Sequence, residues 1–180
     1  MRASRLLLPI LLVALAGCPH SDEPAGEREL PDQVVEGFVM HESSSGERLY
    51  TLEADTAYVY EVDERVDVVV PTVTFYDEAG EVHAVLHAKR GAIYSQNSNL
   101  VARGEVRVET ADSTVLLTDS LSWSNVSREV RTDAPVDIAT PKGRVKGQGL
   151  VSDAGLTRIE ILSEVTGQSE YRFEPLPDTE

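Results

Sequence analysis

The side chains able to do chemistry in this chain are few, and they do not form a catalytic set. His83 and His87 stand four positions apart, which along a strand separates them by about 13 Å, too far to share a metal ion. Acidic residues at 63–64 and 77–81 could bind calcium, but carboxylates spaced in this way in turns are usually just solvated. The sequence has no Gly-x-Ser-x-Gly elbow, no phosphate-binding glycine loop and one cysteine. We therefore expect no enzyme, no metal and no other cofactor.

That single cysteine, Cys18, ends a short apolar segment at the N-terminus. Arg2 and Arg5 precede an eleven-residue apolar stretch, shorter than the roughly 20 helical residues that span a bilayer. The sequence Leu15-Ala16-Gly17-Cys18 resembles a bacterial lipobox, in which the signal peptide is removed before the cysteine and lipid is attached to its sulfur. The alternative is an ordinary secretory signal with a chance cysteine. We expect residues 1–17 to be a lipoprotein signal peptide and lipidated Cys18 to hold the protein on a membrane.

Charge and composition divide the rest of the chain into a tether, one domain and a tail. The sequence has 16 Lys+Arg and 31 Asp+Glu, a net charge of −15, which loss of the two arginines in residues 1–17 would lower to −17. Nucleic acid is excluded as a partner because phosphate backbones select basic surfaces. Residues 18–33, polar, acidic and proline-containing, are expected to be a flexible tether, and residues 171–180 a disordered tail. Residues 34–170 remain as one domain long enough for a sizeable core.

Period-two alternation predicts β-strands over most of this domain. Apolar and polar residues alternate in five segments, and turn residues at 77–80, 141–143 and 153–155 separate several of them. A frame of 29 to 34 residues also repeats four times between Ala54 and Val165, each unit a strand, a turn and a returning strand. We predict an all-β fold, an antiparallel twisted jelly roll or open sandwich of stacked hairpins. The alternating segments are 50–54, 66–75 (interrupted by Pro71), 100–110, 130–138 and 159–161.

The inward-facing positions of these strands carry many Val and Ala residues but few large side chains, since the chain has three Phe and one Trp. Small side chains could leave a slot between the layers, whereas a dry core would be filled to native density. Alternation alone favours the filled core. The candidate lining residues are Val68, Val70, Phe75, Val106, Val108, Leu121, Trp123, Val136 and Ile138.

Several motifs, taken in order, resemble the LptC family, the periplasmic component of the lipopolysaccharide-export machinery. They are Gly46-x-x-x-Tyr50-x-Leu52-x-Ala54, Pro71-x-Val73-x-Phe75-x-Asp77 and Leu100-x-Ala102-x-Gly104-x-Val106-x-Val108. The likeness covers residues 34–167, nearly all of the predicted domain. It implies a twisted jelly roll, open at both ends, whose interior binds the acyl chains of lipopolysaccharide through the candidate lining residues.

The resemblance also implies partners. One end would dock onto the inner-membrane lipopolysaccharide-export transporter, and the other would pass lipid to the periplasmic bridge jelly-roll protein by strand pairing. Many family members are held by an N-terminal helix, whereas this chain would use the lipid on Cys18. We expect it on the periplasmic side of the cell envelope, at the inner membrane in preference to the outer. The expected partner edges carry Phe38 and Val39 on the first strand, and Ile159, Ile161 and Val165 on the last.

A second hypothesis belongs to a different class. The protein would be a membrane-tethered scaffold lipoprotein with a solidly packed jelly roll, acting only through contacts at its strand edges. The two hypotheses differ in whether the interior accepts a lipid.

Overall fold

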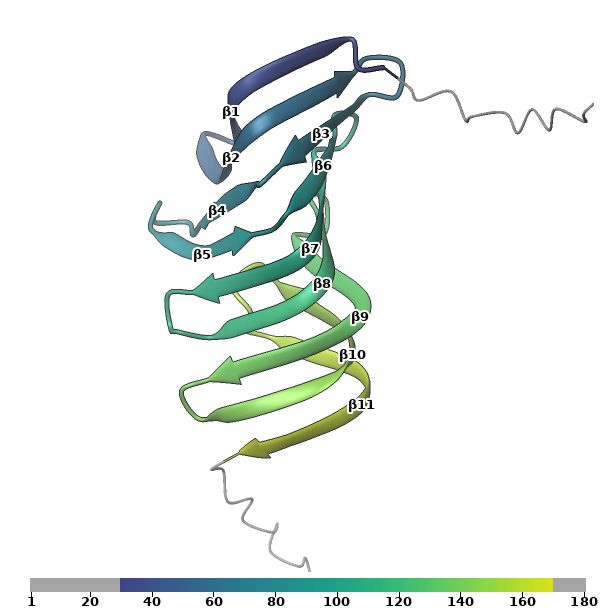
Figure 1. Ribbon diagram of the computed structural model, residues 1–180. Helices are drawn as coiled ribbons and strands as arrows, with labels where there is room; N and C mark the ends of the chain where they lie inside the picture. Colours follow the sequence, from purple (N-terminus) through teal and green to yellow (C-terminus); the bar gives the residue numbers. More distant parts are fainter. Residues whose placement is uncertain (1–29, 170–180) are drawn as a thin grey trace, which may run out of the picture.

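A computed structural model describes residues 30–169, which form one antiparallel sheet of eleven strands, with no helix in that range (Figure 1). The all-β fold predicted from the sequence is confirmed. The predicted signal peptide, Cys18, most of the tether and the tail lie outside the described residues. The strands are β1 (Gln33–Ser44), β2 (Glu47–Tyr60), β3 (Arg65–Val69), β4 (Thr72–Tyr76), β5 (Val82–His87), β6 (Arg90–Tyr94), β7 (Asn99–Thr110), β8 (Val115–Ser124), β9 (Glu129–Thr140), β10 (Gly143–Asp153) and β11 (Ile159–Ser169).

The sheet bends across the middle of its strands. β2 pairs with β3 along one half and with β4 along the other, and β7 pairs in the same way with β6 and β5. Further along the sheet, the bend is made by β-bulges, where the register shifts and residues such as Gly104, Gly149 and Glu164 take positive φ angles. Each strand therefore contributes to two layers, and Figure 1 shows β7 to β11 curving in this way.

The two halves of the bent sheet face each other. We call the half that contains β3 and β6 layer one and the half that contains β4 and β5 layer two. On the side opposite the bend, turns that end layer one meet strand ends of layer two: Asn125 contacts Glu42, and Gly155 contacts His83. We call this line the mouth. The apolar faces of both layers point inward and form the core, in which Tyr50, Leu116 and Leu150 are fully buried.

One unit of the repeated sequence frame corresponds to hairpin pairing. Thr118 and Val136, eighteen residues apart, are register partners on β8 and β9, and Gly147 on β10 is the partner of Val136 on its other side. Gly147 also allows β11 to approach, because a Cβ atom there would lie 2.3 Å from the Ile161 Cγ2 atom. In this unit the small first residue of the frame lies opposite a buried valine, whereas in the first unit Val73 pairs with Leu52, and in the last unit Val165 is exposed.

One predicted lining residue is placed wrongly by the alternation. Val70 does not face the interior; its side chain is 52% exposed and its backbone has a φ of 51°. Pro71 follows it, and the chain leaves β3 before entering β4, so the alternation that buries Val68 stops at this point. Val70 is therefore removed from the candidate site.

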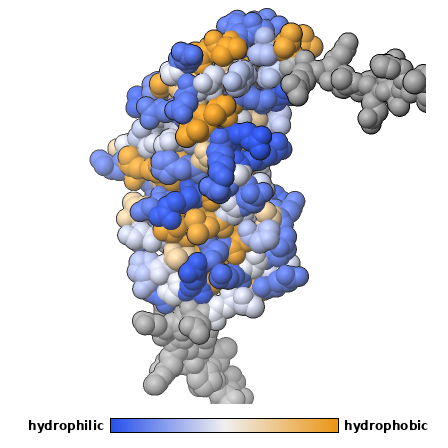
Figure 2. Space-filling view, in the orientation of Figure 1, coloured by the Kyte–Doolittle hydropathy of each residue, from blue (hydrophilic) through white to orange (hydrophobic). Residues whose placement is uncertain are grey.

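The outer faces of the layers are polar and hold several ion pairs. Figure 2 shows apolar side chains reaching this side of the surface in separate patches among hydrophilic ones. On layer two, the Arg144 guanidinium donates two hydrogen bonds of 2.6 Å to the Asp137 carboxylate, and the Lys146 Nζ atom lies 3.0 Å from it. Chiefly because of the hydrogen bonds from Arg144, the pKa of Asp137 is lowered to about 2.

Candidate functional site

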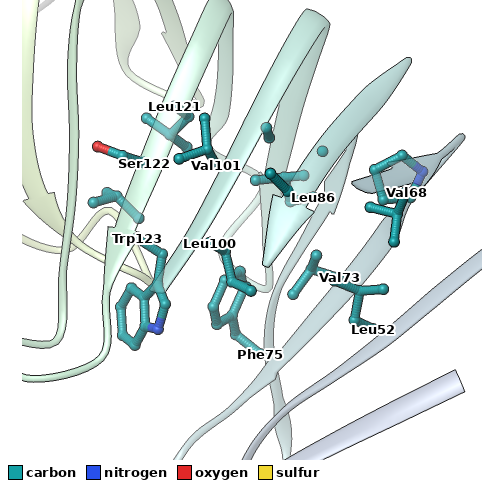
Figure 3. A pocket seen from close by; sticks show the side chains of 15 residues that line it. Leu52, Val68, Val73, Phe75, Leu86, Leu100, Val101, Leu121, Ser122 and Trp123 are labelled. Atoms are coloured by element: carbon teal, nitrogen blue, oxygen red, sulfur yellow. The ribbon is translucent and has the colours of Figure 1, made fainter. Parts of the chain in front are cut away.

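Three aromatic side chains join the two layers near the mouth. Tyr50 on β2 and Phe75 on β4 are register partners in layer two, with ring centroids 5.9 Å apart. Trp123 on the layer-one half of β8 meets Phe75 from the opposite side, with a centroid separation of 5.3 Å (Figure 3). Both pairs are tilted, an arrangement favoured by the ring quadrupoles. We call Tyr50, Phe75 and Trp123 the aromatic bridge.

A small apolar cavity lies beside this bridge. Its volume is about 20 Å³, enough for roughly one water molecule and far too small for an acyl chain. The interior is therefore filled in this conformation, and a chain can enter only if the layers or their side chains move apart. The cavity is lined by Leu52, Val68, Pro71, Val73, Phe75, Leu86, Gly91, Ala92, Leu100, Val101, Ala102, Leu121, Ser122, Trp123 and Val130 (Figure 3).

The predicted lining residues divide into two groups. Val68, Phe75, Leu121 and Trp123 surround the cavity. The other four are buried in the core but do not line it: Val106, Val108, Val136 and Ile138.

Several cavity residues were missed by the sequence analysis. Leu52 and Val73 are register partners, and Val73 is also the partner of Leu86 on β5. Leu52 has the same alternation phase as Tyr50, and Val73 the same phase as Phe75, so this signal was present in the sequence. Leu86 and Leu100 occupy buried positions of their strands as well. The cavity thus lies between the β2–β4–β5 part of layer two and the β6–β7–β8 part of layer one.

The mouth is closed by few contacts. The Tyr50 hydroxyl donates a 3.3 Å hydrogen bond to the carbonyl oxygen of Ser98, in the turn after β6. The Asn125 side-chain amide, in the turn after β8, donates a 3.4 Å bond to the Glu42 carboxylate on β1. In the turn after β10, Gly155 lies against His83 so closely that a Cβ atom would be 1.5 Å from the His83 Nε2 atom.

The aromatic bridge has one titratable member. Burial raises the pKa of the Tyr50 hydroxyl well above its ordinary value of 10.0, and the nearby negative charge of Glu42 adds to the rise. Tyr50 therefore stays neutral and keeps its proton available for the bond to Ser98 at any physiological pH.

The predicted partner residues lie on the two edge strands. Within residues 30–169, β1 pairs only with β2, and β11 pairs only with β10, so each has one unpaired side. On β1, Phe38 packs against the core while Val39 is exposed. On β11, Ile159 and Ile161 pack against the core; Val165, also on β11, is exposed.

The described residues hold no other obvious chemistry. In the range 30–169, no three His, Cys, Asp or Glu side chains come together as a metal site. Within the same range there is no helix with the length and apolar character needed to cross a bilayer.

Comparison with known proteins gives the family. A family model described as "Lipopolysaccharide-assembly, LptC-related" matches residues 6–170. The chain belongs to the LptC family. No curated protein matches it. Membership of this family implies a role for the chain in lipopolysaccharide transport and assembly at the cell envelope, in agreement with the resemblance seen in its sequence motifs.

Proposed function

We propose that this member of the LptC family is held on the periplasmic side of the membrane by lipidated Cys18, accepts lipopolysaccharide acyl chains between its two layers and passes them to a neighbouring jelly roll. One observation carries the proposal: an apolar interior, bridged by Phe75 and Trp123, lies behind a mouth closed by few contacts. Family membership supports lipopolysaccharide as the ligand.

Parting the two layers requires less free energy at the mouth than at the bend. On the bend side the layers are joined by the continuous strands. At the mouth, within residues 30–169, they are joined by the side-chain hydrogen bonds from Tyr50 to Ser98 and from Asn125 to Glu42, each worth about 1 kcal/mol net. Parting the Phe75–Trp123 pair adds about 0.5–1.5 kcal/mol. An acyl chain gains about 0.8 kcal/mol for each buried methylene, so about three to four methylenes offset these three contacts.

The free edges support transfer between proteins. The unpaired sides of β1 and β11 lie at opposite ends of the sheet order, so a partner strand at each would extend the sheet in both directions. In this proposal one edge meets the inner-membrane transporter and the other meets the periplasmic bridge protein. Lipid would then move from one jelly-roll interior to the next.

A second candidate function is a membrane-tethered scaffold that uses only these edges. The observation that favours it is the filled interior, whose cavity of about 20 Å³ holds no lipid in this conformation. In the scaffold the mouth would never open.

In-cell photo-crosslinking separates the two. A photoreactive residue at Phe75 or Trp123 should capture lipopolysaccharide, whereas one at Arg107, on the outer face of β7, should not. Absence of capture at both interior positions, in a protein that is folded and membrane-bound, would refute lipid acceptance and support the scaffold.

A further inference from the structure

The aromatic bridge contains a buried hydrogen-bond donor that has no acceptor among the described residues. Trp123 is 7% exposed, and its indole Nε1 atom is buried with no hydrogen-bond partner among the residues that the structure describes. A buried donor left unpaired is unfavourable by about 1–3 kcal/mol, so such groups are rare and require an explanation. A smaller aromatic ring such as phenylalanine would fill part of this space without an unpaired donor.

The position of this donor relates it to the proposed lipid path. Trp123 lines the apolar cavity and stacks against Phe75 across the two layers. In Figure 3 the indole nitrogen lies on the side of the ring that faces Phe75. A chain that separates these two rings therefore lies beside the N–H group. The cavity lining in front of it is made almost entirely of hydrocarbon side chains, which offer no competing acceptor.

We propose that the Trp123 indole N–H donates a hydrogen bond to an oxygen of the bound chain, so that the interior selects acyl chains, with their ester or amide carbonyl, over plain hydrocarbon. This inference rests on the proposed function, because it needs a chain between the layers. It adds a positioning rule: the carbonyl end of the chain stops beside Trp123, while the methylenes lie deeper, among Leu52, Val73 and Leu86. Burial in an apolar site strengthens such a bond relative to one in water.

The test compares two lipids that differ only in that oxygen. Ester-linked and ether-linked phosphatidylcholines with identical short chains, both below their micelle concentrations, are titrated into the full chain and binding is measured by calorimetry. Wild-type protein should bind the ester form about five- to tenfold more tightly, the ratio expected for one net hydrogen bond. Replacement of Trp123 by benzothienylalanine, in which sulfur takes the place of the N–H group, should reduce that ratio to about one without weakening the ether lipid.

Trp123→Phe is the second variant, and it adds a readout from the free protein. Removing an unpaired buried donor should offset part of the loss of ring volume, so its melting temperature should fall less than that of Trp123→Leu.

The possible outcomes are distinct. Equal binding of ester and ether lipids by wild-type protein, or an ester preference that survives in the benzothienylalanine variant, would overturn the role of Trp123 and leave the lipid-accepting interior intact. If wild-type protein binds neither lipid but Phe75 and Trp123 still capture lipopolysaccharide in cells, this inference is overturned and the proposed function stands. If capture is absent as well, both fail.

Discussion

Replacing Phe75 by alanine tests whether the interior is as tightly filled as the structure shows. Phe75 is 4% exposed and its ring contacts Tyr50 on one side and Trp123 on the other. Burial of an aromatic side chain of about 150–250 Å² at about 25 cal/mol per Å² corresponds to roughly 4–6 kcal/mol. Measured losses for such truncations are about 3–5 kcal/mol, which we expect for Phe75→Ala. The free energy of unfolding, obtained from urea titration followed by circular dichroism, is the quantity to measure.

Two further results make this prediction specific. Phe75→Leu keeps most of the volume and should lose roughly half as much stability. Phe75→Ala should also regain stability when benzene is added, because an apolar cavity of this kind stays dry and binds small hydrocarbons. A loss below about 1 kcal/mol for Phe75→Ala would refute the reasoning, since it would mean that the ring borders an open slot and is not packed between the layers.

Three other changes test the parts around the site. Asp137→Asn should lower the unfolding free energy at pH 7 by less than about 1 kcal/mol, because its partner Arg144 is well exposed. Because folding lowers the pKa of Asp137, the difference in unfolding free energy between variant and wild type should be largest above pH 4 and should vanish as the pH falls through about 2. Urea titrations across that pH range measure it. Gly147→Ala should speed amide hydrogen exchange in β11, since the new methyl group collides with Ile161; unchanged exchange would mean that β11 does not pack as described. Tyr50→Phe removes the bond to the opposite layer and should cost about 1 kcal/mol. Because folding raises the pKa of Tyr50, wild-type protein should lose stability as pH rises above 10, and the phenylalanine variant should lose less.

The strands and the buried faces could be predicted because they depend on local patterns. Tyr50 and Leu52 alternate with polar neighbours, and the structure buries both. The bends could not be predicted in the same way. Glu105 and Glu164 take positive φ angles within strands, and Val70 does so at a strand break. None of the three is glycine, so composition gives no sign of a left-handed residue at these positions.

The contacts that close the mouth could not be predicted from the sequence either. The bond from Tyr50 to Ser98 joins residues 48 positions apart, and the bond from Asn125 to Glu42 joins residues 83 positions apart. Such contacts depend on how two turns meet across the layers, and no periodicity encodes that. The size of the cavity was likewise open, because alternation shows which side chains point inward but not how completely they fill the space between the layers.

The entry of a chain into the interior can be observed at one residue. Trp123 is the one tryptophan of the sequence, so the tryptophan fluorescence of the protein, excited apart from its tyrosines, reports on the aromatic bridge alone. Bromine quenches tryptophan only at short range. Lipopolysaccharide with brominated acyl chains should therefore quench Trp123, whereas it should leave unquenched a variant in which Trp123→Phe is combined with Arg107→Trp on the outer face. Binding of brominated lipopolysaccharide to the wild-type protein without bromine-dependent quenching would contradict the account, because the acyl chains would then lie outside the two layers.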